Sequence, residues 1–326
     1  VTGVQTCALP ISPDQSSSAS NTSMTGKAPY YGSHSFMRAS SMLGENTQVA
    51  ILGCAFDQGV TNRPGARFGP NSIRQASAML CDGHNPYYRN DPISQELVAD
   101  LGNIDIDPTS IAAGLASIVA ASNILEGKYK PIYLGGDHTI SLAALEYIHS
   151  QHGPVALVHF DAHCDYWPEN FGQTLGHGSV FYHAINRGFI NPQQTVQIGI
   201  RSPVSNDVFI WGIQQGITTV SANSLHINGV DDVADRVRRI IGDQPVYLSI
   251  DIDAFDPSYA PGTGTPEVGG LHSWQALMIM QQLKKLNWVG GDLVEVSPPY
   301  DHADITSLLA ATLVWNMCSL FSQKQK

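Results

Sequence analysis

From residue 49 onward, two kinds of apolar pattern alternate along the chain. Short, near-continuous apolar runs, typical of strands buried on both faces, occupy residues 49–55, 97–101, 131–134, 155–160, 195–200, 216–220, 245–250 and 289–296. Segments with helical periodicity or length occupy residues 71–80, 110–126, 139–151, 179–187, 230–241, 273–286 and 305–321, with Asn71 as the expected cap of the first. This alternation predicts an α/β fold whose central, mostly parallel sheet is covered on both faces.

The first residues differ from the rest of the chain. Residues 1–11 resemble the translation of a sequencing adapter, and residues 12–23 are rich in Ser and Asn. A signal peptide is the alternative, but a basic n-region is missing and the apolar stretch is too short. We therefore expect residues 1–23 to be an adapter-derived, disordered tail, with Met24 or Met37 as the native start. We expect residues 24–326 to form a single catalytic domain, because no repeat, linker or composition break follows Val49.

Composition excludes several classes of function. Charged residues make up 14% of the 326 residues, apolar residues 43%, and the net charge is -11. The chain has no block of Lys or Arg, which argues against binding to nucleic acid or to an anionic membrane. Its apolar runs are shorter than the roughly 20 residues that span a bilayer. The five cysteines form no Cys-x-x-Cys pair, so we expect reduced thiols and a cytoplasmic protein.

Polar side chains follow four of the predicted strands. They form a set of two histidines and four aspartates, namely His138, Asp161, His163, Asp165, Asp251 and Asp253, with Glu295 at the end of the fourth strand. Ligands bind beyond the carboxyl ends of strands in parallel sheets. Residues two apart in an extended backbone also point the same way. We therefore expect Asp161, His163 and Asp165 to converge just beyond their strand.

These six side chains have the composition of a metal site. A strand-end Asp alone is usually a cap or turn residue, but a His between two Asp at alternate positions is hard to explain in that way. Six ligands dominated by carboxylate suit two divalent cations such as Mn²⁺ better than one zinc ion. Water bridging two such ions ionises readily and gives a hydroxide nucleophile.

We expect His159 to be a hydrogen-bonded core histidine. The loop at residues 57–70, rich in Gly, Pro and Arg, matches no phosphate-binding pattern, and we expect a structural or active-site loop.

From residue 49 to the C-terminus the chain resembles the ureohydrolase family, which includes arginases, agmatinases and guanidinobutyrases. The matching stretches are Gly135-Gly-Asp-His138, Phe160-Asp-Ala-His-Cys-Asp165, Ser249-Ile-Asp-Ile-Asp-Ala-Phe-Asp-Pro257, Ala260-Pro-Gly-Thr-Gly-Thr-Pro266 and Glu295-Val-Ser-Pro298. The resemblance implies an arginase-like, three-layer α/β/α fold and two Mn²⁺ ions held by the six residues. It also implies hydrolysis of a guanidinium group to urea and an amine, and a homo-oligomer, trimer or hexamer. The ligand set would also tolerate Ni²⁺ or Co²⁺.

The same resemblance implies catalytic roles. Asp165 would bind metal and also accept a hydrogen bond from the hydroxide, and Glu295 would hold the guanidinium in line. His177, in Leu175-Gly-His-Gly178, matches the histidine credited with proton shuttling. Thr265 matches a position near the substrate guanidinium.

The loop at residues 166–176 bears on the substrate. It lacks the serine and asparagine pattern by which arginases recognise an amino acid, and residues 161–186 contain no Lys or Arg. Tyr166, Trp167 and Glu169 suit the ammonium tail of agmatine, so we expect hydrolysis of agmatine to putrescine and urea. The alternative is 4-guanidinobutyrate, because the spacing from Phe171 to His177 and residues 295–301 also resemble guanidinobutyrases and a neighbouring subunit could supply a base. Hydrolysis of a formimino or amide bond and an inactive, metal-binding regulatory paralogue are further alternatives; the complete ligand set argues against the last.

Overall fold

Eight strands form one sheet in the computed structural model, which describes residues 35–323. The strands are β1 (Val49–Cys54), β2 (Val98–Asn103), β3 (Lys130–Gly135), β4 (Val155–Phe160), β5 (Ile190–Ile200), β6 (Thr218–Ser221), β7 (Pro245–Asp251) and β8 (Asn287–Val294). Their order is β2-β1-β3-β8-β7-β4-β5-β6, and each neighbouring pair is parallel. The predicted parallel sheet is therefore confirmed. The expectation for residues 1–23 lies outside the described residues.

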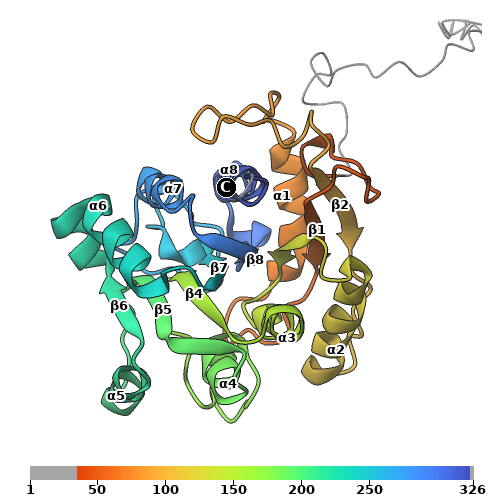
Figure 1. Cartoon of the computed structure of the whole chain (residues 1–326). Coiled ribbons are helices and arrows are strands. Elements are labelled where there is room, and N and C mark those ends of the chain that lie inside the picture. Colours follow the sequence, from red (N-terminus) through yellow and green to blue (C-terminus); the bar gives the residue numbers. More distant parts are fainter. Residues whose placement is uncertain (1–34, 324–326) are drawn as a thin grey trace, which may run out of the picture.

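Helices cover both faces of this sheet and make three layers (Figure 1). One layer contains α1 (Gly69–Ser77), α6 (Ala222–Ile241), α7 (Ser273–Gln282) and α8 (Ile305–Phe321), and the other contains α2 (Ile111–Ser122), α3 (Ile140–His152) and α4 (Val180–Asn186). Successive side chains of β1 point alternately to the two faces of the sheet. Val49 and Ile51 pack in the core beneath the first helix layer, and Ala50 and Leu52 pack in the core beneath the second. This alternation explains the near-continuous apolar runs of the strands.

Short 3-10 helices complete the described chain: η1 (Phe36–Arg38), η2 (Ala66–Phe68), η3 (Asn123–Leu125), η4 (His177–Ser179), η5 (Ile252–Ala254) and η6 (Pro298–Tyr300). Three of them follow the carboxyl ends of strands or carry site residues: η4 begins with His177, η5 contains Asp253, and η6 follows the segment of Glu295. Within residues 35–323, no helix is both long and apolar enough to cross a membrane.

Two predicted helix starts are wrong, and one helix was not predicted. Asn71 does not cap α1, because the helix begins at Gly69 and takes Pro70 into its first turn, where the missing N–H of proline costs nothing. α5 (Asn206–Gln215) was not predicted, because its apolar residues form one run and Phe209 and Ile213 are exposed. α6 begins at Ala222 rather than at residue 230, with a break in helical geometry at Gly229.

The sheet order has a direct consequence for the site. β3, β8, β7 and β4, the four strands followed by the predicted site residues, are consecutive neighbours. Since all four are parallel, their carboxyl ends lie at one edge of the sheet. The fold therefore gathers segments that lie up to about 160 residues apart in the sequence, such as those of His138 and Glu295, which are hydrogen bonded across a separation of 157 residues.

Candidate metal centre and active site

The six predicted ligands form two overlapping clusters at this edge. In the first, ligand atoms of His138, Asp161, Asp165 and Asp251 all lie within 4.8 Å of one another, and all four residues are buried. In the second, the same holds for Asp161, His163 and Asp253. Asp161 belongs to both clusters, as expected of a carboxylate placed between two ions. The arrangement is that of a binuclear metal site.

The geometry around His138 fits a cation. Its Nδ1 lies 2.9 Å from Asp165 Oδ2, 3.2 Å from Asp251 Oδ2 and 3.3 Å from Asp161 Oδ2. Yet this buried nitrogen makes no well-directed hydrogen bond to any described residue. One ring nitrogen can donate at most one hydrogen, so it cannot satisfy three carboxylates. Four ligand atoms directed at a common point instead match the coordination of a divalent cation.

The second cluster is built in the same way around His163. Its Nδ1 lies 3.1 Å from Asp253 Oδ2 and 3.4 Å from Asp161 Oδ1. The other ring nitrogen, Nε2, faces Glu267 Oε1 at 3.9 Å, and Ser202 donates a hydrogen bond of 3.0 Å to that oxygen. A carboxylate on the far side of a histidine ring is a common outer partner of metal-binding histidines.

Backbone hydrogen bonds at the strand ends orient the aspartates. β4 ends at Phe160, after which the N–H of His163 donates to Asp161 Oδ1 at 2.6 Å. The N–H of Asp253 donates to Asp251 Oδ1 in the same way at 2.8 Å, and Asp165 adopts a left-handed conformation with φ 51°. Asp161 lies with Asp165 in the first cluster and with His163 in the second, so the three side chains meet at two adjacent positions rather than at the single one that an extended backbone predicts.

The buried charges of the two clusters also require compensating cations. Burial raises the pKa of Asp251 well above its usual range, and the charges of Asp253 and Asp161 raise it further. Burial lowers the pKa of His138, but its contacts with Asp161, Asp165 and Asp251 raise it well above the usual value. Four carboxylates this close cannot all ionise without compensating positive charge. Two divalent cations balance the formal charge of the four.

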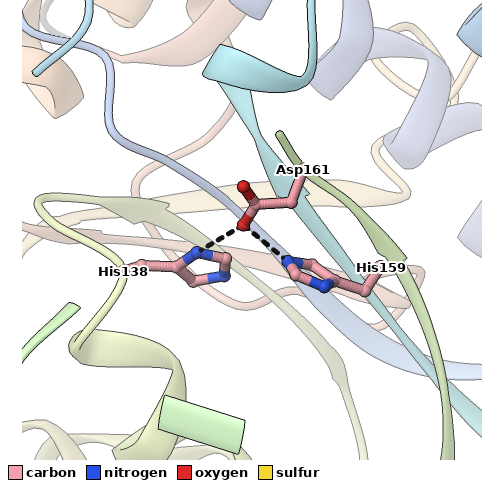
Figure 2. Close-up of side chains that lie close together, drawn as sticks. All are labelled: His138, His159 and Asp161. Atoms are coloured by element: carbon pink, nitrogen blue, oxygen red, sulfur yellow. Dashed lines mark hydrogen bonds and ion pairs between the residues drawn. The ribbon is translucent and has the colours of Figure 1, made fainter. Parts of the chain in front are cut away.

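His159 lies beneath the first cluster and holds Asp161 in place. Figure 2 shows the rings of His138 and His159 directed at the same oxygen of Asp161, which is 2.8 Å from His159 Nε2. The amide of Gln197 donates to His159 Nδ1 at 3.0 Å, so that Nε2 carries the hydrogen and donates it to Asp161. His159 is the hydrogen-bonded core histidine that the sequence predicts. Gln197 was missed, because its contact depends on the pairing of β4 with β5.

A second pair of predicted residues, His177 and Glu295, lies beside the metal clusters. His177 Nδ1 is 3.1 Å from Glu295 Oε1, which also accepts the backbone N–H of His138 at 2.9 Å. Glu295 Oε2 is buried and has no hydrogen-bond partner within residues 35–323. Burial lowers the pKa of His177, but the hydrogen bond and charge of Glu295 raise it, to about 9. Glu295 therefore favours the protonated form of the ring.

A cavity of about 280 Å³ opens onto these groups. Its lining combines metal-cluster residues with outer side chains: Thr61, His163, Asp165, Trp167, Asn170, Phe171, His177, Gly178, Ser202, Asp251, Asp253 and Thr265. Thr61 belongs to the loop at residues 57–70, and its hydroxyl lies 2.9 Å from His177 Nε2. That loop is therefore part of the candidate active site. Asn170, Phe171 and Ser202 were not predicted, because no spacing in the sequence shows which loop tips meet.

Of the four predicted substrate-binding residues, two line the cavity. Trp167 contributes its ring, and Thr265 donates a hydrogen bond of 3.1 Å to Asp253 Oδ2. Tyr166 is 3% exposed and packs against Trp211 instead, with 5.5 Å between ring centroids. Glu169 is exposed and does not belong to the lining. Contact with a substrate stays a prediction for all four.

The chain is similar to known ureohydrolases over most of its length. It matches the arginase family over residues 47–319. It is 42% identical over 300 residues to a protein named agmatinase from Chromobacterium violaceum, with 91% of each chain covered. It is 42% identical over 279 residues to the mitochondrial guanidino acid hydrolase of Homo sapiens, with 85% of this chain and 79% of that protein covered.

A solved structure has the same fold. Proclavaminate amidino hydrolase from Streptomyces clavuligerus superimposes with a TM-score of 0.85 and 36% sequence identity, and the match covers 91% of this chain and 99% of the other. Both the three-layer fold and the ureohydrolase resemblance predicted from the sequence are thereby confirmed. The protein belongs to the arginase family, and its paired His and Asp clusters make it a metal-dependent ureohydrolase.

Proposed function

We propose that the protein hydrolyses agmatine to putrescine and urea with two Mn²⁺ ions. The observation that carries this proposal is the unpaired, buried Oε2 of Glu295, beside His177 and the metal clusters. A buried carboxylate oxygen without a partner is costly. A guanidinium supplies both the positive charge and the N–H donors that this oxygen lacks.

His138, Asp161, Asp165 and Asp251 would hold one cation, and Asp161, His163 and Asp253 the other. When bound, two such cations lower the pKa of water and so supply a nucleophile at neutral pH. The protein's own task is to place the guanidinium carbon within reach of that nucleophile. Glu295 does so by accepting a charge-assisted hydrogen bond from the guanidinium at Oε2, while its Oε1 stays fixed by His138 and His177.

His177 provides the proton that the leaving amine requires. Its Nδ1 is held by Glu295 Oε1, and its Nε2 lies at the cavity edge against the hydroxyl of Thr61. The hydrogen bond and the charge of Glu295 raise the pKa of the ring and favour its protonated form. The amine released from the guanidinium carbon is a stronger base than imidazole and accepts that proton. Thr61 keeps the ring directed at the cavity.

The cavity lining favours a cationic or neutral tail. Among the described residues, no Lys or Arg belongs to the lining, whereas the rings of Trp167 and Phe171 do. Aromatic faces attract an ammonium group and offer a carboxylate no ion pair. The similarity to a protein named agmatinase supports the same substrate. The second candidate is 4-guanidinobutyrate, which the equal identity to the human guanidino acid hydrolase favours.

Urea release with agmatine and 4-guanidinobutyrate, measured side by side on the Mn²⁺-loaded protein, tests the proposal. We expect kcat/KM to be at least about ten-fold higher for agmatine, equivalent to roughly 1.4 kcal/mol. Preference for 4-guanidinobutyrate would support hydrolysis of a guanidinium group but show that agmatine is not the preferred substrate. Release of formamide and an amine, without urea, from a formimino compound would show that a different C–N bond is cleaved. No turnover with any of these compounds would favour an inactive paralogue.

A further inference from the structure

A buried carboxylate outside the metal clusters is not used by the reaction. Asp292 lies in β8, at the centre of the sheet, and is 0% exposed. No Lys or Arg among residues 35–323 pairs with it; its hydrogen-bond partners are two hydroxyl groups of the neighbouring strand β7. Ser249 Oγ donates to Asp292 Oδ1 at 2.7 Å, and Tyr247 donates to Oδ2 at 2.8 Å. Both hydroxyl-bearing residues are also 0% exposed.

One of these hydroxyl groups connects Asp292 to the metal centre. Ser249 Oγ lies 2.8 Å from Nε2 of His138, the ring whose Nδ1 faces three aspartates. A serine hydroxyl has a single hydrogen. Ser249 donates it in the hydrogen bond to Asp292, because a carboxylate can only accept hydrogen bonds. Ser249 must therefore accept from His138, so Nε2 carries the ring hydrogen. In the neutral ring Nδ1 then keeps a free lone pair, which is the form that binds a cation.

We propose that Asp292 and Ser249 are positioning residues that fix the tautomer and the ring orientation of His138 for metal binding. Without Asp292, the Ser249 hydroxyl could turn and donate to Nε2, which would place the hydrogen on Nδ1 and block the ligand position. The register of the sheet makes the arrangement rigid, because Ser249 and Asp292 are direct partners in the β7–β8 pair. This inference rests on the proposed two-cation site, but it does not depend on agmatine as the substrate.

The sheet supplies a matched pair of variants. Ser249→Ala and Tyr247→Phe each remove one buried hydroxyl donor from the same carboxylate, but only Ser249 touches His138. Metal-free protein of each variant is titrated with Mn²⁺ in a calorimeter without substrate, so the result is independent of turnover. We expect Ser249→Ala to weaken one of the two Mn²⁺ sites by about 10- to 100-fold, and Tyr247→Phe to leave both nearly unchanged.

Equal weakening in the two variants would mean that the hydroxyl groups merely support the fold, and no weakening in either would also overturn the proposal. If Ser249→Ala does not fold, Asp292→Asn decides, because the amide is a weaker acceptor and holds Ser249 less firmly. A loss of affinity at one site that exceeds the loss in Tyr247→Phe is the expected result. An equal loss would overturn the assignment. Failure of the substrate proposal would leave all these outcomes unaffected.

Discussion

Glu295 is both buried and held in a strained backbone conformation. It is 1% exposed and adopts a left-handed backbone conformation with φ 64°. For a residue with a side chain this conformation costs roughly 1–2 kcal/mol. Asp165, in the first metal cluster, is strained in the same way with φ 51°. Strain of this kind gathers where the positions of functional groups are fixed by their surroundings.

Replacement of Glu295 by Gln tests its role. The amide keeps the size of the side chain but loses the charge that holds a guanidinium. We expect the metal content to stay at the wild-type level while kcat/KM for agmatine falls by about 100- to 1000-fold. Metal analysis and urea release on the same preparation measure both. Glu146→Gln, on the exposed surface of α3, is the control and should change neither. Loss of metal in Glu295→Gln would show that Glu295 supports the metal site and would contradict its role in holding the guanidinium.

At the residue scale, the sequence predicts ligands better than the residues that support them. Asp161, His163 and Asp165 were found because three metal-ligating side chains within five residues have few structural explanations. Gln197 and Thr61 have no such signal, because their contacts with His159 and His177 depend on strand pairing and on the path of a loop. Tyr166 was selected by its chemistry, but the structure directs its ring into the core beside Trp211.

The end of β3 shows the same dependence at the scale of an element. The N–H of Gly136 donates to the carbonyl of Cys54 at 2.9 Å, and its own carbonyl accepts the N–H of Glu295 at 2.8 Å. A Cβ at Gly136 would lie 2.3 Å from the carbonyl oxygen of Phe56. The ends of β1, β3 and β8 therefore approach one another only because residue 136 lacks a side chain, and His138 lies two residues further on.

Gly136→Ala should therefore disturb the fold and the site together. We expect the free energy of unfolding to fall by about 1–3 kcal/mol, the usual cost of forcing extra atoms into packed structure, and Mn²⁺ to bind more weakly. Urea denaturation and a metal titration measure the two effects. Gly44→Ala is the control, since a Cβ there has its nearest neighbour at 3.7 Å. Equal stability of the two variants would contradict the close approach.

Element boundaries were predictable where apolar periodicity and burial coincide. The ends of β4 and α8 agree with the sequence prediction, because both elements are packed into the core along most of their length. α5 escaped prediction because the tertiary structure leaves much of its apolar surface exposed, so that no periodic pattern marks a buried face.

At the scale of the whole molecule, strand order creates the active site. The sequence predicts a parallel sheet with functional groups at its carboxyl edge, but the apolar runs are too alike to specify which strands are neighbours. The structure places β3, β8, β7 and β4 side by side, which brings the two metal clusters, Glu295 and the cavity to one edge. The homo-oligomer implied by family resemblance stays a prediction.

The central claim is that the two clusters form one binuclear centre that hydrolyses a guanidinium group. Its most direct test is a titration of the metal-free protein with Mn²⁺, in which bound metal and urea release from agmatine are measured in the same samples. The account predicts two Mn²⁺ per chain and urea release that reaches its maximum as the second ion binds. In Asp251→Asn it predicts that bound metal and urea release are lost together. Saturation at one ion, or two bound ions without urea from either agmatine or 4-guanidinobutyrate, would contradict it.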